Sequence, residues 1–117
     1  MKSSEEIRDL AIVSLEDLKG LDIKLIDVRP ITEIMDYMII ASGTSRRHAQ
    51  SLAEKVVEDA KLAGIKPLGV EGQETGEWIL IDLIDVVVHV MLPATRELYD
   101  LERLWERVPD RSGQAGE

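Results

Sequence analysis

The spacing of apolar residues along the chain predicts three helical segments. The first, over residues 4–19, begins after a capping box at Ser3 and has apolar positions that recur with the helical period. The second follows the turn Gly43-Thr44-Ser45 and shows the same period. The third begins at Pro93 and ends at Pro109, because proline is favoured in the first helical turn and cannot continue a helix.

Five shorter stretches have the alternating or continuous apolar character of β-strands. They cover residues 22–28, 36–42, 66–71, 77–82 and 85–92. The second of these is almost entirely apolar, which is typical of a strand that is buried on both faces. Together with the helices, the order α-β-β-α-β-β-β-α predicts an α/β or α+β fold in which helices flank a mixed β-sheet.

The last two predicted strands divide their side chains between two faces. A hairpin centred on Leu83-Ile84 places Trp78 opposite His89 and Asp82 opposite Asp85 on one face. The turn itself is atypical, since a two-residue hairpin favours Gly, Asn or Asp, and a wider turn is the alternative. The other face is entirely apolar and is therefore the predicted core face: Ile79, Ile81, Val86, Val88 and Val90.

Composition limits the classes of protein that fit. The chain has 117 residues with 44% hydrophobic and 32% charged residues, which predicts one soluble domain over residues 1–108 and a flexible tail over residues 109–117. It has no cysteine and only two histidines, so we expect neither a zinc site nor another cofactor. No apolar run is long enough to span a membrane and no signal segment is visible, so we expect a cytoplasmic protein.

The charge is unevenly distributed. The formal net charge is −9, and between Glu71 and Glu106 nine acidic residues stand against two basic ones. Such acidity argues against direct nucleic-acid specificity, because phosphates would be repelled, but it favours a basic protein partner. Both tryptophans and Tyr99 lie in the same region. We therefore predict a docking surface there, made by Glu71, Trp78, Leu80, Asp82, Asp85, His89, Arg96 and Tyr99.

Several of these residues have a second interpretation. Asp82 and Asp85 suit solvated turn residues, contacts for a basic partner, or an acid–base or metal pair, although no nucleophile lies near them in the sequence. His89 fits a packed, hydrogen-bonded sheet residue as well as an interface residue. For Arg96 and Tyr99, a packing role and an interface role fit equally well.

The turn Gly43-Thr44-Ser45 also has two interpretations. With Arg46, Arg47 and His48 after it, a helix N-terminus of this kind is able to hold a phosphate. The simpler interpretation is an N-cap followed by solvated arginines. The next strand carries only Glu71 and lacks the pair of carboxylates that hold magnesium in nucleotidyltransferases. We expect no catalytic and no metal-binding residues.

Three segments resemble one family. They read IDVRPITEIMDYMIIASGTSRRHAQSLAEKV, EGQETGEWILIDLIDVVVHVM and RELYDLERLW, and their combination is similar to the ribosomal silencing factor family, also called the RsfS or Iojap family. The resemblance covers about residues 22–105. One departure is visible, because the family usually has a glycine before the second aspartate where this chain has Ile84.

The resemblance implies a fold like that of nucleotidyltransferases without the catalytic carboxylates. It also implies a translational repressor that binds the large ribosomal subunit through its universal, basic ribosomal protein L fourteen and sterically blocks joining of the small subunit. Two alternatives belong to other classes: a nucleotidyltransferase-like nucleotide-binding protein or enzyme, and a homodimer that uses the Trp78 face on itself.

Overall fold

A mixed, five-stranded β-sheet forms the centre of the fold, with strand order β1-β2-β5-β4-β3. The computed structural model describes residues 2–107, so the predicted tail at 109–117 lies outside the described residues. The central strands β2 and β5 are parallel, and the other neighbours are antiparallel. The strands are β1 (Leu21–Asp27), β2 (Tyr37–Ser42), β3 (Gly69–Glu71), β4 (Trp78–Asp82) and β5 (Val86–Met91).

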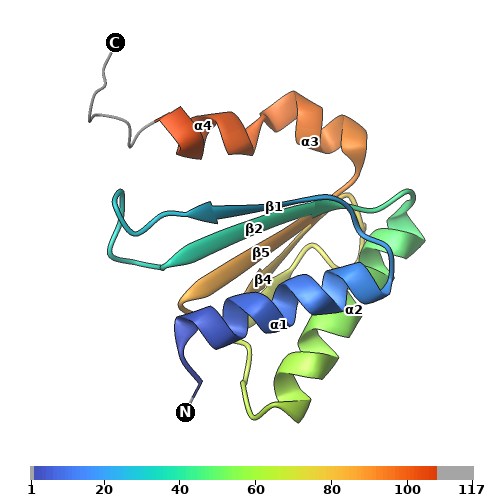
Figure 1. Ribbon diagram of the computed structural model, residues 1–117. Coiled ribbons are helices and arrows are strands. Elements are labelled where there is room, and N and C mark those ends of the chain that lie inside the picture. The colour runs from blue at the N-terminus through green and yellow to red at the C-terminus, as the bar shows by residue number, and fades with distance from the viewer. Residues whose placement is uncertain (1, 108–117) are drawn as a thin grey trace.

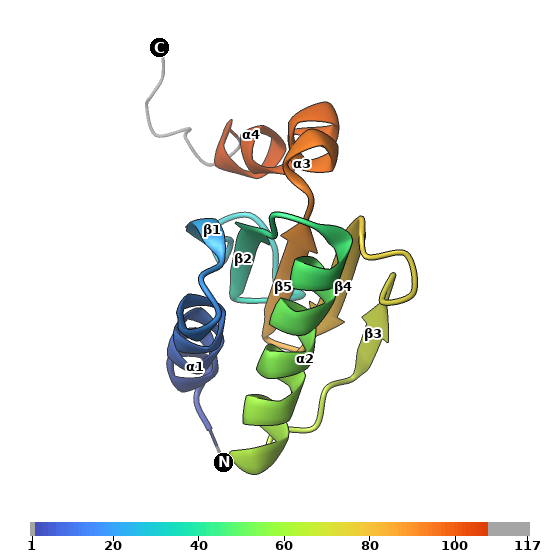
Figure 2. The ribbon, with the colours of Figure 1, turned by 90° about the vertical axis from the view of Figure 1, so that its right-hand side faces the viewer.

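Helices cover the two faces of the sheet unequally. The long helices α1 (Ser4–Asp17) and α2 (Arg46–Leu62) lie on one face, and the short helices α3 (Pro93–Tyr99) and α4 (Leu101–Arg107) lie on the other (Figures 1 and 2). The predicted mixed sheet with flanking helices is confirmed. The long helices cover more of their face than the short ones do, and this difference decides where a surface is left open.

The last helix differs from the prediction, because it is two helices and not one. Asp100 separates them in the left-handed backbone conformation at φ 48°, with its N–H donating to the Arg96 carbonyl at 2.9 Å. Aspartate tolerates this conformation better than most residues do, so the chain turns there without glycine or proline. The predicted end at Pro109 lies outside the described residues.

The first helix begins as predicted. The Ser3 hydroxyl accepts a hydrogen bond from the Glu6 N–H at 3.1 Å, and the Glu6 carboxylate accepts one from the Ser3 N–H at 2.8 Å. This reciprocal pair satisfies backbone donors that a helix otherwise leaves free at its N-terminus. The helix ends at Asp17, two residues before the predicted end.

The main hydrophobic core lies between the sheet and the helices α1 and α2. The five residues predicted for the core face of β4 and β5 are fully buried there: Ile79, Ile81, Val86, Val88 and Val90. A second, smaller cluster lies on the opposite face beneath α3 and α4. It contains Ile26, Val28, Met38, Ile40 and Met91, with Trp78, Leu101, Trp105 and Met35 packed against it.

The β4–β5 register differs from the prediction by two residues. Trp78 pairs with Met91, and Asp82 pairs with Val87, so Asp82 and Asp85 do not oppose one another. The turn is centred one residue later than predicted, which lets Leu83 enter the main core with 1% exposure. Because the shift is by an even number of residues, the side chains within the two strands keep their predicted faces, whereas Asp85 becomes a turn residue.

Candidate docking surface on the half-covered sheet face

The sheet face that carries α3 and α4 is only partly covered. Pairing across the strands places Glu71 beside Leu80 and Leu80 beside His89 on this face. Leu80 is half-buried and Glu71 is exposed, whereas His89 lies nearer the sheet centre and is buried. The β3–β4 side of the face is therefore open, while the β1–β2 side is closed by the second cluster and the short helices.

Trp78 lies at the boundary between the open and closed parts. Its indole N–H donates a hydrogen bond of 2.9 Å to Nδ1 of His89, and its ring centroid is 4.9 Å from that of Tyr99 in α3. The side chain is half-buried and packs against the second cluster. Trp78 therefore contacts both the sheet, through His89, and α3, through Tyr99, at the edge of the open surface.

His89 is held in the neutral form. It is 5% exposed, and burial lowers its pKa from 6.5 to about 4, because a charged imidazolium is poorly solvated there. Its Nδ1 accepts the Trp78 N–H, so the ring proton is on Nε2. The interpretation of His89 as a packed, hydrogen-bonded sheet residue is confirmed, and it supports the surface from below.

Arg96 fixes α3 to the rest of the fold. Its guanidinium donates to the Ser42 hydroxyl at 2.9 Å and to the Asp22 carbonyl at 2.7 Å, and it pairs with Glu102 at 2.9 Å. The hydrogen bond from Arg96 lowers the pKa of the Glu102 carboxyl. The Arg96 side chain is 11% exposed, so its donors point into the fold and its contacts are those of a positioning residue.

The open part of the face is acidic and its charges are not neutralised. Asp82 is half-buried, and its carboxylate accepts the Ile84 N–H at 2.8 Å. Glu71 is exposed. Within residues 2–107 neither of these two carboxylates makes an ion pair. A basic surface brought against this face would meet acidic groups that have no competing partner.

The hairpin turn below this surface is strained. The Leu83 N–H donates to the Val86 carbonyl at 2.9 Å, and the Asp85 N–H donates to the Leu83 carbonyl at 3.0 Å. Ile84 lies between them at φ 76°, a conformation that glycine adopts freely and a β-branched residue disfavours. The Ile84 side chain is 55% exposed, so no burial compensates for this strain.

The turn before α2 uses its polar groups internally. The Ser45 hydroxyl accepts the His48 N–H at 3.0 Å, and the Thr44 N–H donates to Nδ1 of His48 at 2.9 Å. Nε2 of His48 lies 2.7 Å from the Leu18 carbonyl, which only accepts, so Nε2 carries the proton. Arg46 pairs with Glu77 at 2.6 Å and Arg47 is exposed. The N-cap interpretation is confirmed, and the Ser45 hydroxyl and the His48 ring are already used within the turn.

The predicted site residues therefore separate into three kinds. The outer residues on the open face are Glu71, Leu80 and Asp82, and Trp78 and Tyr99 border them. His89 lies beneath, and Arg96 lies within the fold. Asp85 is not on the open face, because it lies in the turn between β4 and β5, near α1 and the end of α2. Sequence reasoning missed Val87, which is half-buried on the same face beside Asp82. The alternation of side chains along β5 was the available signal, because it places Val87 on the same face as His89.

We searched the described residues for metal-binding groups and for helices that could cross a membrane. Among residues 2–107, no three His, Cys, Asp or Glu side chains come together as a group that could hold a metal ion. In the same part of the chain, none of the helices has the length and apolar character needed to cross a membrane.

Known proteins are similar to this chain in sequence and in fold. A family model described as "Ribosomal silencing factor during starvation" matches residues 1–116. The ribosomal silencing factor RsfS of Chromobacterium violaceum is 50% identical over 101 residues, which cover 86% of this chain and 83% of that protein. A mouse protein named "Mitochondrial assembly of ribosomal large subunit protein 1" is 35% identical over 83% of this chain and 44% of its own length.

A solved structure agrees with these matches. The crystal structure of a Chromobacterium violaceum protein superposes with a TM-score of 0.88 at 46% identity, covering 99% of this chain and 92% of that one. The fold that carries the open acidic face is therefore already known from a related protein. The matching family model, the sequence identities and the common fold agree, and the chain belongs to the ribosomal silencing factor (RsfS) family.

Proposed function

We propose that this protein binds the large ribosomal subunit through the basic, universal ribosomal protein L fourteen and sterically blocks joining of the small subunit. The observation that carries the proposal is the open face beside Trp78, where Glu71 and Asp82 make no ion pair within residues 2–107. The name of the mouse relative, which refers to the large ribosomal subunit of mitochondria, supports the large subunit as the partner.

The physical roles of the residues follow from their positions. The carboxylates steer a basic partner toward the face and favour one orientation on contact. Trp78 and Tyr99, whose rings are 4.9 Å apart, supply an apolar contact at the border of the open face that loses water on binding. His89 and Arg96 hold these two aromatic side chains in place through the sheet and α3.

The proposed mechanism is occlusion and includes no catalytic step. A domain bound on the subunit face that meets the small subunit occupies the space that the small subunit needs. The internal hydrogen bonds of Thr44, Ser45 and His48 support this choice over a nucleotidyltransferase-like function, because the Ser45 hydroxyl, the Thr44 and His48 N–H groups and the His48 ring are already bonded.

The test uses purified ribosomal subunits. The protein is mixed with large subunits, small subunits are added, and the products are separated by sedimentation. We expect the protein to migrate with free large subunits, not with joined ribosomes, and to lower the joined fraction as its concentration rises. Migration with joined ribosomes, or an unchanged joined fraction, would reject occlusion.

A charge-reversal pair identifies the face that binds. Asp82→Lys changes the open face, and Glu58→Lys makes the same change of charge on the exposed surface of α2. We expect Asp82→Lys to weaken large-subunit binding about tenfold or more, and Glu58→Lys to leave it within about twofold. Equal weakening by both would show that total charge matters and the proposed face does not.

A further inference from the structure

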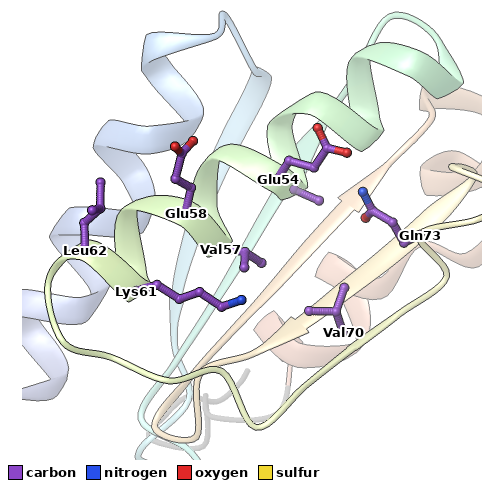
Figure 3. A pocket seen from close by; sticks show the side chains of 8 residues that line it. Glu54, Val57, Glu58, Lys61, Leu62, Val70 and Gln73 are labelled. Atoms are coloured by element: carbon purple, nitrogen blue, oxygen red, sulfur yellow. The ribbon is translucent and has the colours of Figure 1, made fainter.

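A groove separates α2 from the edge strand β3, on the α2 side of the sheet and away from the open face. It has a volume of about 510 Å³. Figure 3 shows Val57 and Leu62 of α2 on one side and Val70 of β3 on the other. Leu62 is 80% exposed, so the groove leaves apolar surface open to water.

The strand that borders the groove has an unpaired edge. β3 is the last strand in the order β1-β2-β5-β4-β3, and it pairs only with β4. The Val70 side chain alternates with Gly69 and Glu71 and points to the α2 side, where it lines the groove. An exposed strand edge of this kind presents N–H and C=O groups to which another extended chain is able to add.

Gln73 supplies a polar group at one end of the groove that lacks a partner. Its Oε1 is buried and accepts no hydrogen bond within the described residues. Its Nε2 donates to the Gln50 carbonyl at 3.3 Å, and the Gln50 amide donates to the Gln73 carbonyl at 2.9 Å, so the side chain is held in place. An unsatisfied buried acceptor favours a ligand that brings an N–H donor.

The charges around the groove select the sign of the ligand. Glu54 and Glu58 line it, and Glu74 lies in the loop that follows β3. Lys61 is the one basic residue among those that line the groove. None of these three glutamates makes an ion pair within residues 2–107. A groove with an apolar floor and an acidic rim is complementary to a basic chain with an apolar side chain.

We propose that this groove binds an extended, basic segment of another protein, which adds beside β3 as a further strand. An apolar side chain of the segment lies between Val57 and Val70, one of its N–H groups donates to Gln73 Oε1, and its basic side chains face the glutamates. This site goes beyond the proposed ribosome binding, because it lies on the other side of the sheet. A protein docked through its Trp78 face still presents the groove, and so links a second protein to the large subunit.

The probe is a synthetic peptide with blocked ends, acetyl-Lys-Thr-Lys-Val-Lys-Thr-Lys-amide, together with its counterpart in which glutamate replaces lysine. Each is titrated into the isotope-labelled, full-length protein and followed by nuclear magnetic resonance. We expect the basic peptide to shift the amide signals of α2 and of residues 68–74, and to slow hydrogen exchange in β3. Shifts confined to α3 and the Trp78 face, or equal binding of the acidic peptide, would overturn the proposal.

Two lysine substitutions of partly exposed valines separate the groove from the general apolar surface. Val70→Lys changes the groove at a position 38% exposed, and Val13→Lys makes the same change on α1 at a position 53% exposed. We expect Val70→Lys to weaken the basic peptide about tenfold and Val13→Lys to leave it within about twofold. Unchanged binding by Val70→Lys overturns the proposal, provided that its spectrum shows a folded protein.

Independent variants distinguish this site from the proposed ribosome contact. Glu58→Lys should weaken the basic peptide and spare large-subunit binding, whereas Asp82→Lys should do the opposite. Peptide binding is also measured on the protein already bound to large subunits, where we expect it to persist. Loss of the peptide on that complex, or loss of both activities in Glu58→Lys, contradicts two separate sites. Failure of subunit binding alone leaves the groove result standing.

Discussion

The indole N–H of Trp78 donates to Nδ1 of His89 across neighbouring strands, at 2.9 Å. The acceptor nitrogen exists only while the imidazole is neutral, and burial keeps it neutral by lowering its pKa to about 4. The orientation of the tryptophan at the edge of the open face therefore depends on a histidine that is itself 5% exposed. Stability and the geometry of the docking surface are linked through this pair.

His89 should make stability depend on pH. The unfolded chain binds a proton at His89 near pH 6.5 and the folded chain only near pH 4, so the stabilising contribution is complete above pH 6.5 and is lost as the pH falls toward 4. The loss should be on the order of 3 kcal/mol. Urea unfolding at pH 7 and pH 4.5 measures it.

The variant His89→Gln serves as the comparison, because it keeps a side-chain acceptor for Trp78 and does not titrate. Hydrogen-bonded carboxylates also lose stabilisation on acidification, since hydrogen bonds lower the pKa values of Asp59 and Glu102. The difference between the two proteins isolates the histidine. An identical pH dependence in both would show that His89 is not its source.

Trp78→Ala should weaken binding to large subunits by about 2 kcal/mol or more, because it removes an aromatic contact that loses water on binding. It should also lower the free energy of unfolding by roughly 2–3 kcal/mol, since Trp78 packs on the second cluster and satisfies His89. The domain should still fold, because the main core lies on the other face. Thermal melting and co-sedimentation are measured on the same samples, and Trp78→Phe shows how much depends on the N–H.

Ile84→Gly should stabilise the protein by about 1 kcal/mol, by relieving the positive φ of a β-branched residue. Ile84→Ala is the matched control, because it removes the same exposed side chain but keeps a Cβ at φ 76°. Chemical denaturation of the three proteins gives the comparison. A glycine variant no more stable than the alanine variant would mean that the backbone strain is small.

Arg96→Ala should loosen α3. It removes the hydrogen bonds to Ser42 and Asp22 and leaves the Ser42 hydroxyl buried without that donor, a change that should cost about 2 kcal/mol. Arg103→Ala is the control, because Arg103 is 72% exposed and its ion pair with Asp100, at 3.9 Å, is long and solvent-exposed. Such a pair contributes little to stability. Hydrogen exchange in α3 should quicken in the first variant and not in the second.

The sequence predicts most of the fold because its signals are local. The alternation in β4 and β5 assigns Ile79 and Val88 to the core, and the capping box at Ser3 marks the start of α1. Two features escape such signals. Leu83 moves the turn by one residue because burial in the core outweighs the strain placed on Ile84, and Asp100 interrupts the last helix without glycine or proline.

The candidate site is predicted less completely. Alternation brings Trp78, Leu80 and Asp82 to one face, but it does not show that α3 and α4 cover half of that face. Arg96 illustrates the difference, since its partners Ser42 and Asp22 are distant in the sequence and no local pattern indicates them. The groove beside β3 likewise depends on how far α2 lies from the edge strand, which is a property of the packed chain.

The position of β5 has a consequence for the order of folding. This strand is the last of the five along the chain, yet it lies between β2 and β4 at the centre of the sheet. The hairpin of β1 and β2 and the pair of β3 and β4 therefore have no common neighbour until Met91 has been synthesised. The core closes late and through contacts that are distant in sequence, so we expect a newly made chain to stay open to chaperones until its β5 emerges.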